Sequence, residues 1–261
     1  MKNPFERFGI VHLSPSSLNL FRAEPAFWSM RYLAGMKDEM GVAPLSGLAV
    51  EAGLDVYLMG AQDRLDKDEA GVSQDKGCVD AAVDAALQNY QLNTGGEVTD
   101  EIEARHRLIE PMVRQACIGI AGSGPLLARQ IKIETWIDGI EVPVIGFIDY
   151  STEHFDLDLK TTLRIPSAPR PDHLRQVAVY AHARGKPQRL FYVSDKRHTI
   201  HMPTEEMLEA AWSEVVSIAK NLRKLLSVSG SPAEFNEFCT PDYDAFYWNE
   251  KTTAAAKEVF K

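Results

Sequence analysis

Two carboxylates and one amine stand close together in the segment 146–162, GFIDYSTEHFDLDLKTT. Asp149 ends an apolar run, Asp158 follows nine positions later, and Lys160 comes two residues after it. Side chains at positions i and i+2 of a strand point to the same face. Asp156, Asp158 and Lys160 would then share one face of a strand. A hairpin joining 149 to 158 would bring the carboxylates of Asp149 and Asp158 near one point.

This grouping suits phosphodiester hydrolysis. Carboxylate oxygens are ligands for hard divalent ions such as Mg²⁺. Such an ion activates a bound water and stabilises charge on a phosphate, while a neighbouring ammonium group orients the water or stabilises the transition state. The spacing alone leaves two alternatives open. Alternating Asp and Lys form a solvated strand face with cross-strand ion pairs, and two carboxylates can act as an acid–base pair without a metal.

The elements around this group are predicted from hydrophobic periodicity and turn signals. Alternating patterns and a turn at Asp138–Gly139 predict a β-meander. Pro171 opens a helix that Gly185 ends, and Pro25 divides an earlier helical segment. The expected strands are 127–137, 141–150, 154–160, 189–194 and 198–202. The expected helices are 13–34 in two parts, 45–65, 72–92, 99–120, 171–184 and 204–227. From Gly230 onward the sequence has no strong periodicity.

These patterns predict an α/β (α+β) fold in a single domain over residues 1–261. Residues 1–122 would form a mainly helical part, 123–228 a sheet core with the chemical group, and 229–261 a C-terminal tail. Each apolar run is interrupted by charges or prolines, which predicts no membrane span. The N-terminus lacks a secretory signal, so a cytoplasmic protein is expected. Cys78, Cys117 and Cys239 lie far apart in the sequence, so we expect them to be small buried hydrophobic residues.

The formal net charge of −9 argues against a polyanionic partner at first sight, but the charges are unevenly distributed. Residues 51–103 contain 13 acidic and three basic residues, whereas residues 160–198 contain nine Lys or Arg and two Asp. A polyanion is attracted by the field within about a Debye length, not by the net charge of the whole chain. Arg164 and Arg170 lie in a Pro-rich loop that suits contact with a phosphate backbone.

The order Asp149…Asp158-Leu159-Lys160 resembles the PD-(D/E)XK nuclease superfamily, in particular its RecB-like, phage-type exonuclease branch. Other segments match in the same order over roughly residues 13–195. LSPSSLNLFRAEPAFWSMRYL resembles the N-terminal Ser-x-Ser helix, GLAVEAGL the motif that carries a metal-side residue, and HLRQVAVYAHA the Gln-x-x-x-Tyr motif. Several weak motifs in order are more specific than any one of them.

The resemblance implies a restriction-endonuclease-like core, a mixed central sheet flanked by helices, with a helical N-terminal elaboration. It implies Glu51, Asp149, Asp158 and the Leu159 carbonyl as metal ligands and Lys160 as the catalytic lysine. Gln176 would contact the site. The expected contacts to nucleic acid are Ser16, Thr161, Arg164, Arg170, Arg175 and Tyr180.

Two departures from the family pattern qualify the comparison. Many members have His where this chain has Glu51, which leaves the ligand geometry open. Some relatives carry four cysteines for an iron–sulfur cluster, but FCTPDYDAFYW near the C-terminus contains only Cys239, so no cluster is expected.

The resemblance therefore implies a DNA exonuclease that uses Mg²⁺, with Mn²⁺ able to substitute, and that processes single- or double-stranded ends in recombination or repair. A recombination or annealing protein and a homo-oligomer are further expected partners, in the host cytoplasm if a phage encodes the chain. The alternatives are an endonuclease of the same superfamily and a non-catalytic DNA-binding scaffold with a degenerate nuclease fold.

Overall fold

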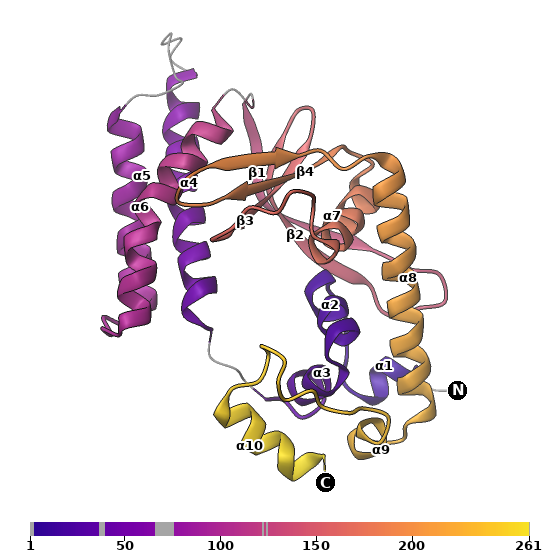
Figure 1. The fold of residues 1–261 in the computed structure, drawn as a ribbon. Coiled ribbons are helices and arrows are strands. Elements are labelled where there is room, and N and C mark those ends of the chain that lie inside the picture. The colour runs from indigo at the N-terminus through magenta and orange to yellow at the C-terminus, as the bar shows by residue number, and fades with distance from the viewer. Residues whose placement is uncertain (1–2, 37–39, 66–75, 122, 124, 261) are drawn as a thin grey trace.

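The computed structural model describes residues 3–36, 40–65, 76–121, 123 and 125–260. Its centre is a five-stranded sheet in the order β1-β2-β3-β4-β5, in which β3 and β4 are parallel and the other neighbours are antiparallel (Figure 1). The strands are β1 (Leu126–Thr135), β2 (Val144–Thr152), β3 (Asp156–Thr161), β4 (Gln188–Val193) and β5 (His198–His201).

Helices cover both faces of this sheet. The N-terminal helices are α1 (Pro4–Arg7), α2 (Pro15–Ala23) and α3 (Pro25–Tyr32). A helical layer follows, formed by α4 (Val42–Leu65), α5 (Lys76–Asn93) and α6 (Asp100–Ile120). The remaining helices are α7 (Pro171–Arg184), α8 (Glu205–Val228), α9 (Pro232–Asn236) and α10 (Glu250–Val259). The predicted mixed α/β architecture is confirmed.

The alternation of side chains along β4 divides the interior into two cores. Leu190 and Tyr192 belong to the core shared with α7, α8 and the N-terminal helices. Phe191 and Val193 point to the opposite face and belong to the core formed with α4, α5 and α6. In β3, Leu157 belongs to this second core and Leu159 packs against it. This confirms that the polar side chains of β3 face α7, because successive strand residues point to opposite faces.

Local signals fixed several boundaries close to their predicted positions. Pro25 separates α2 from α3, and Gly185 ends α7 with a left-handed backbone (φ 61°). Gly139 has φ 80° in the turn between β1 and β2, a conformation that a residue with a Cβ rarely adopts. The first residues predicted for the third long helix, 72–75, lie outside the described part of the chain.

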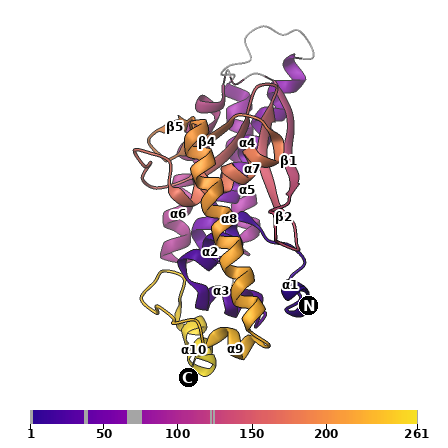
Figure 2. The same ribbon diagram turned by 90° about the vertical axis from the view of Figure 1, so that its right-hand side faces the viewer.

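The C-terminal tail contains two helices that periodicity did not predict, α9 and α10. Ser231 and Asn249 cap them by accepting hydrogen bonds from the backbone N–H groups of Glu234 and Thr252. Helices this short present too few turns for an amphipathic pattern to stand out. They pack with α1–α3 into a terminal lobe, which α8 links to the sheet (Figures 1 and 2).

One described helix, α4, contains a window that is long and apolar enough to cross a membrane by length and composition alone, Val42–Gly60. Pro44, Glu51 and Asp55 interrupt this window, as the sequence analysis describes for each apolar run. Ala49, Val50 and Leu54 of this window are fully buried in the core with α5 and α6.

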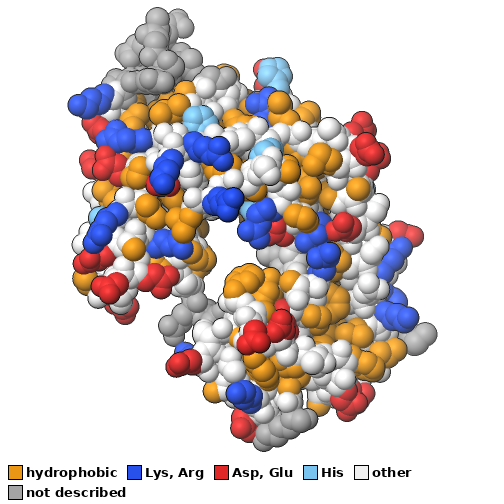
Figure 3. All heavy atoms as spheres, viewed as in Figure 1, with side chains coloured by type: hydrophobic (Ala, Val, Ile, Leu, Met, Phe, Trp, Pro, Cys, Tyr) orange, Lys and Arg blue, Asp and Glu red, His pale blue; other side chains and the backbone are white. Residues whose placement is uncertain are grey.

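The terminal lobe and the α4–α6 layer stand apart below the sheet. Figure 3 shows an opening between them, visible from one side of the molecule to the other. Lys and Arg side chains gather on the side of the opening formed by the sheet, and hydrophobic side chains on the side formed by the C-terminal segment (Figure 3).

Candidate active site

The antiparallel pairing of β2 and β3 brings Asp149 beside the segment that carries Asp158 and Lys160. Tyr150 is paired with Leu157, and the next position in this register sets Asp149 opposite Asp158. One carboxylate oxygen of Asp149, Oδ2, accepts a hydrogen bond from the Leu159 backbone N–H at 2.7 Å. The predicted grouping of the two carboxylates by a hairpin is confirmed.

Asp158 and Lys160 form a buried ion pair on the α7 side of β3. Lys160 Nζ lies 2.7 Å from Asp158 Oδ2, and the Asp158 side chain is only 1% exposed. Lys160 is the partner of Oδ2, whereas Oδ1 is buried with no hydrogen-bond partner among the described residues. A buried carboxylate normally accepts several hydrogen bonds. Asp158 therefore keeps unused ligand capacity at the bottom of the site.

Burial and neighbouring charges shift the pKa values of Asp149, Asp158 and Lys160. Burial raises the pKa of Asp149 well above its usual range, and the charge of Asp158 adds to this. Burial also raises the pKa of Asp158, against the opposing effect of Lys160. Burial alone would lower the pKa of Lys160, but the charges of Asp158 and Asp149 outweigh it and leave this pKa raised. Lys160 is therefore an ammonium group at neutral pH, in a site with an excess of negative charge.

Glu51 lies on α4, and its side chain is turned toward β1. Its Oε1 accepts a short hydrogen bond from the Gln130 amide. Burial and the charge of Asp55 raise the pKa of Glu51, and Asp158 contributes to the same shift. Glu51 is thus within electrostatic range of the site. In the described ranges, however, no three His, Cys, Asp or Glu side chains are arranged to hold a metal ion. The predicted cluster of three carboxylates is not formed, because Gln130 holds the Glu51 carboxylate.

The remaining groups still fit a divalent cation. Asp158 offers one buried oxygen, Oδ1, without a partner among the described residues, and Asp149 lies near it on β2. Carboxylate and carbonyl oxygens are the donor set that Mg²⁺ and Mn²⁺ prefer. Asp149, Asp158 and the Leu159 carbonyl would hold such an ion.

Gln176 and Tyr180 interact with each other one turn apart on α7. The Gln176 amide donates a hydrogen bond to the Tyr180 hydroxyl at 2.7 Å. Tyr180 is 2% exposed, and a Cβ added at Gly146 would lie 2.7 Å from its ring. The prediction that Tyr180 contacts nucleic acid is therefore wrong. Its buried ring packs on β2, and its hydroxyl holds Gln176, which is half-buried.

A cavity of about 640 Å³ opens directly from Lys160. Thr161, Arg164 and Arg170 line it, as expected for phosphate contacts. Its other lining residues include His173, Tyr192 and Arg197, which the sequence analysis did not identify.

Tyr192 is brought to the cavity by the parallel pairing of β3 and β4, and His173 by the first turn of α7. Tyr192 lies beside Lys160 in that register, and its hydroxyl is 2.7 Å from His173 Nδ1. Burial and the charge of Lys160 lower the pKa of His173 to about 4, so this ring is neutral near pH 7. The available sequence signal was the position of His173 one turn before Gln176 on the same helix.

Two other predicted contacts lie elsewhere. Arg175 is 5% exposed, and its guanidinium bridges Asn19 at 2.6 Å and Glu214 at 2.8 Å. The prediction that it contacts nucleic acid is wrong, because the side chain ties α7 to α2 and α8. Ser16 is exposed in the first turn of α2, where its hydroxyl lies 3.0 Å from that of Ser14.

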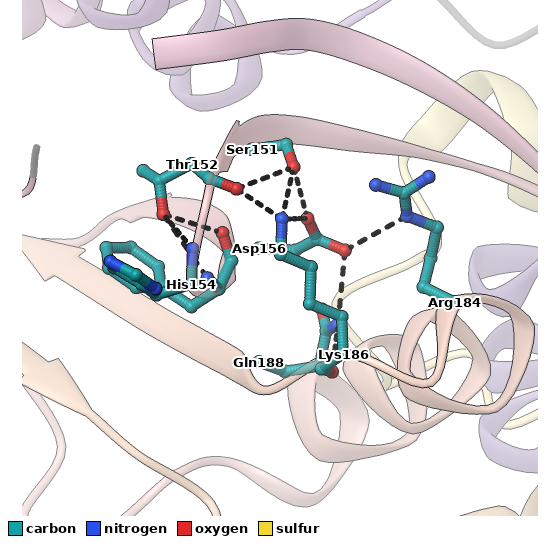
Figure 4. A network of polar contacts seen from close by, with 8 residues as sticks. Ser151, Thr152, His154, Asp156, Arg184, Lys186 and Gln188 are labelled. Carbon is teal, nitrogen blue, oxygen red and sulfur yellow. Dashed lines mark hydrogen bonds and ion pairs between the residues drawn. The ribbon is translucent and has the colours of Figure 1, made fainter. Parts of the chain in front are cut away.

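Part of the basic segment is used inside the protein, around the fully buried Asp156 (Figure 4). Ser151 donates a hydrogen bond to Asp156 at 2.6 Å, and Lys186 Nζ lies 3.6 Å from the same carboxylate oxygen. Arg184 and Gln188 donate to its other oxygen, each at 3.4 Å. This network fixes the start of β3, two residues before Asp158. Asp156 is thus a structural residue on the face that it shares with the site.

Comparison with known proteins agrees with this site. The family model of the PD-(D/E)XK nuclease superfamily matches residues 12–240. No curated protein matches the chain. A solved structure described as "Crystal structure of SSO0001" aligns over 79% of this chain and 95% of its own, at 12% identity and a TM-score of 0.32. A similarity this low carries no argument about fold or function. The family match spans every strand of the sheet and the whole site, and the chain therefore belongs to the PD-(D/E)XK nuclease superfamily, whose nucleases act on DNA and generally use divalent metal ions.

Proposed function

We propose that this protein is a Mg²⁺-dependent DNA exonuclease that shortens DNA ends during recombination or repair. The observation that carries the proposal is the buried Asp158–Lys160 pair next to Asp149, with Lys160 lining a basic cavity. A mere solvated strand face would not bury its carboxylate to 1% exposure. The buried pair also argues against a degenerate scaffold, because apolar residues in place of a buried ion pair are often neutral or stabilising, so that stability alone does not require the pair.

Each residue of the candidate active site has its own role. Asp149, Asp158 and the Leu159 carbonyl would hold the divalent ion, which supplies an activated water and charge stabilisation when bound. Lys160 carries a positive charge at neutral pH, so it donates hydrogen bonds to the water or to a phosphate oxygen and does not act as a base. Gln176, held by Tyr180, presents its remaining amide atoms from α7. Glu51 contributes negative charge from α4.

The cavity positions the substrate. Arg164 and Arg170 are exposed there and suit the phosphate backbone, a contact that is independent of base sequence. The neutral His173 adds no charge but fixes the Tyr192 hydroxyl next to Lys160. The cavity therefore grips a strand by its phosphates and carries it toward the carboxylates.

End-labelled linear DNA and covalently closed circular DNA, each incubated with Mg²⁺ and the full-length protein, test this proposal. We expect linear DNA to be shortened while closed circles persist, and Mn²⁺ to support the same products. Circles that are nicked as fast as linear DNA is shortened would establish an endonuclease instead. DNA that is bound but left intact with both metals would establish a scaffold.

A further inference from the structure

The C-terminal segment 240–248, TPDYDAFYW, carries aromatic rings at the protein surface. Phe246 is 85% exposed, the highest value among the large hydrophobic residues that the structure describes. Its ring lies 4.0 Å from that of Tyr247, measured between centroids and tilted by 33°. Leaving an aromatic pair in water gives up hydrophobic stabilisation, which suggests that it has a binding role.

This aromatic pair is anchored by the packing of neighbouring rings against Phe27. Trp248 is 9% exposed and packs edge-on against Phe27, with 4.8 Å between ring centroids. Tyr243 packs against the same Trp248 at 5.3 Å, and Tyr247 against Phe27 at 5.8 Å. Phe27 belongs to the main core. The exposed ring of Phe246 is therefore presented by a segment anchored on both sides of it.

The segment lies across from the basic loop of the active-site cavity. Burial raises the pKa of Tyr247, and the charges of Asp172 and Arg170 have smaller effects on it. Arg170 lines the cavity that begins at Lys160. In Figure 1 the same segment rises from the terminal lobe toward the sheet, and in Figure 3 hydrophobic side chains border the opening there, facing Lys and Arg side chains on the other side.

The two sides of the opening have complementary chemistry. Arg164, Arg170 and Arg197 on the cavity side attract phosphates. On the aromatic side the segment itself contains Asp242 and Asp244 and no Lys or Arg, and Phe246 offers a flat apolar ring. A strand that satisfies both sides must present phosphates to one and free base faces to the other. Bases in a duplex are stacked inward, whereas those of a single strand can stack on protein rings.

We infer that Phe246 and Tyr247 form a stacking platform for unpaired nucleotides, and that the strand delivered to the active site is single-stranded DNA. This inference rests on the proposed nuclease function and adds the form of its substrate. The phosphates of the strand lie along the arginine loop while its bases stack on the aromatic pair. A double-stranded end would enter only after its terminal nucleotides separate.

Fluorescence anisotropy of labelled oligothymidylate and of a blunt duplex, with the full-length protein in EDTA so that no hydrolysis occurs, tests the inference. Phe246→Ala should weaken single-strand binding by about tenfold, as loss of one base–aromatic stack does, and should leave duplex binding unchanged. Phe246→Trp should bind as the unaltered protein does. Phe246→Leu, which keeps an apolar side chain without a ring, should behave like the alanine variant. Trp136→Ala, at another exposed aromatic residue (57%), is the matched control and should have no effect.

Equal single-strand binding by Phe246→Ala and the unaltered protein would overturn the inference. So would equal binding by the Phe246→Leu and Phe246→Trp variants, because stacking requires a ring. Phe246 is 85% exposed, so its replacement removes little packing from the fold, and the comparison of the leucine and tryptophan variants controls for any loss of stability. Binding without metal is independent of cleavage. If Phe246→Ala binds single strands as the unaltered protein does, and the unaltered protein degrades linear DNA, only the stacking platform is refuted. If Phe246→Ala loses single-strand binding and the unaltered protein cleaves no DNA, only the nuclease function is refuted.

Discussion

Replacing Lys160 with Met should destabilise the protein in a pH-dependent way, in addition to stopping cleavage. The ammonium group of Lys160 is the cation 2.7 Å from Asp158, and its charge also acts on Asp149. The Lys160→Met variant keeps the length of the side chain but leaves two neighbouring carboxylates without it. Removing one partner of a buried ion pair typically costs about 3–5 kcal/mol, because the other charge stays buried and uncompensated.

The sign of the pH dependence follows from the raised pKa values of Asp149 and Asp158. An acid with a raised pKa in the folded state binds more protons there than in the unfolded chain. Stability therefore falls as the pH rises from the unfolded value through the folded one. Without Lys160 both pKa values rise further. The loss of unfolding free energy caused by Lys160→Met should be largest near pH ~8 and much smaller near pH ~5, where the carboxylates take up protons.

Urea denaturation of both proteins in EDTA at these two pH values measures the effect. The double variant Asp158→Asn/Lys160→Met is the matched control, and it should recover most of the lost stability because both charges are removed together. A penalty of the same size at both pH values, or a Lys160→Met protein as stable as the unaltered one, would refute the account of a buried, mutually dependent charge group.

Two further predictions concern the support of the site and its substrate contacts. Gly146→Ala should lower the free energy of unfolding by about 1–3 kcal/mol, because the added Cβ would lie 2.7 Å from the Tyr180 ring. The control Gly41→Ala, whose Cβ would meet only Pro44 at 3.9 Å, should not lower it. Equal denaturation midpoints for the two variants would contradict this packing. Arg164→Ala should reduce the slope of log DNA affinity against log salt concentration by about 0.7–0.9. Arg175→Ala should keep that slope and lower the stability of the protein instead. The reverse pattern in salt titrations would contradict the roles given to these two arginines.

Short-range signals allowed the centre of the site to be predicted from the sequence. The alternation of β3 placed Asp158 and Lys160 on one face, and the antiparallel return from β2 placed Asp149 beside them. Both rules depend only on neighbouring residues. Pro25 and Gly185 marked helix boundaries for similarly local reasons, because one cannot continue a helix and the other adopts a left-handed backbone easily.

The partners of individual side chains could not be predicted in this way. Glu51 is held by Gln130, which has φ 48° in a strand with an irregular register, and no local pattern marks that contact. Arg175 and Tyr180 looked like polar positions on a helix face, but the packing of α7 between the sheet and α8 buries both. Tyr192 reaches the cavity only through the parallel pairing of β3 with β4, a contact between segments separated by a whole helix.

The central claim is that Asp158 is required for cleavage of DNA phosphodiester bonds. The most direct measurement is the rate at which the unaltered protein and Asp158→Asn degrade end-labelled linear DNA in Mg²⁺, with both proteins shown to be folded by denaturation. We expect the rate to fall by roughly a thousandfold, the factor given by about 4 kcal/mol of lost transition-state stabilisation. An Asp158→Asn protein that degrades DNA as fast as the unaltered one would contradict the account.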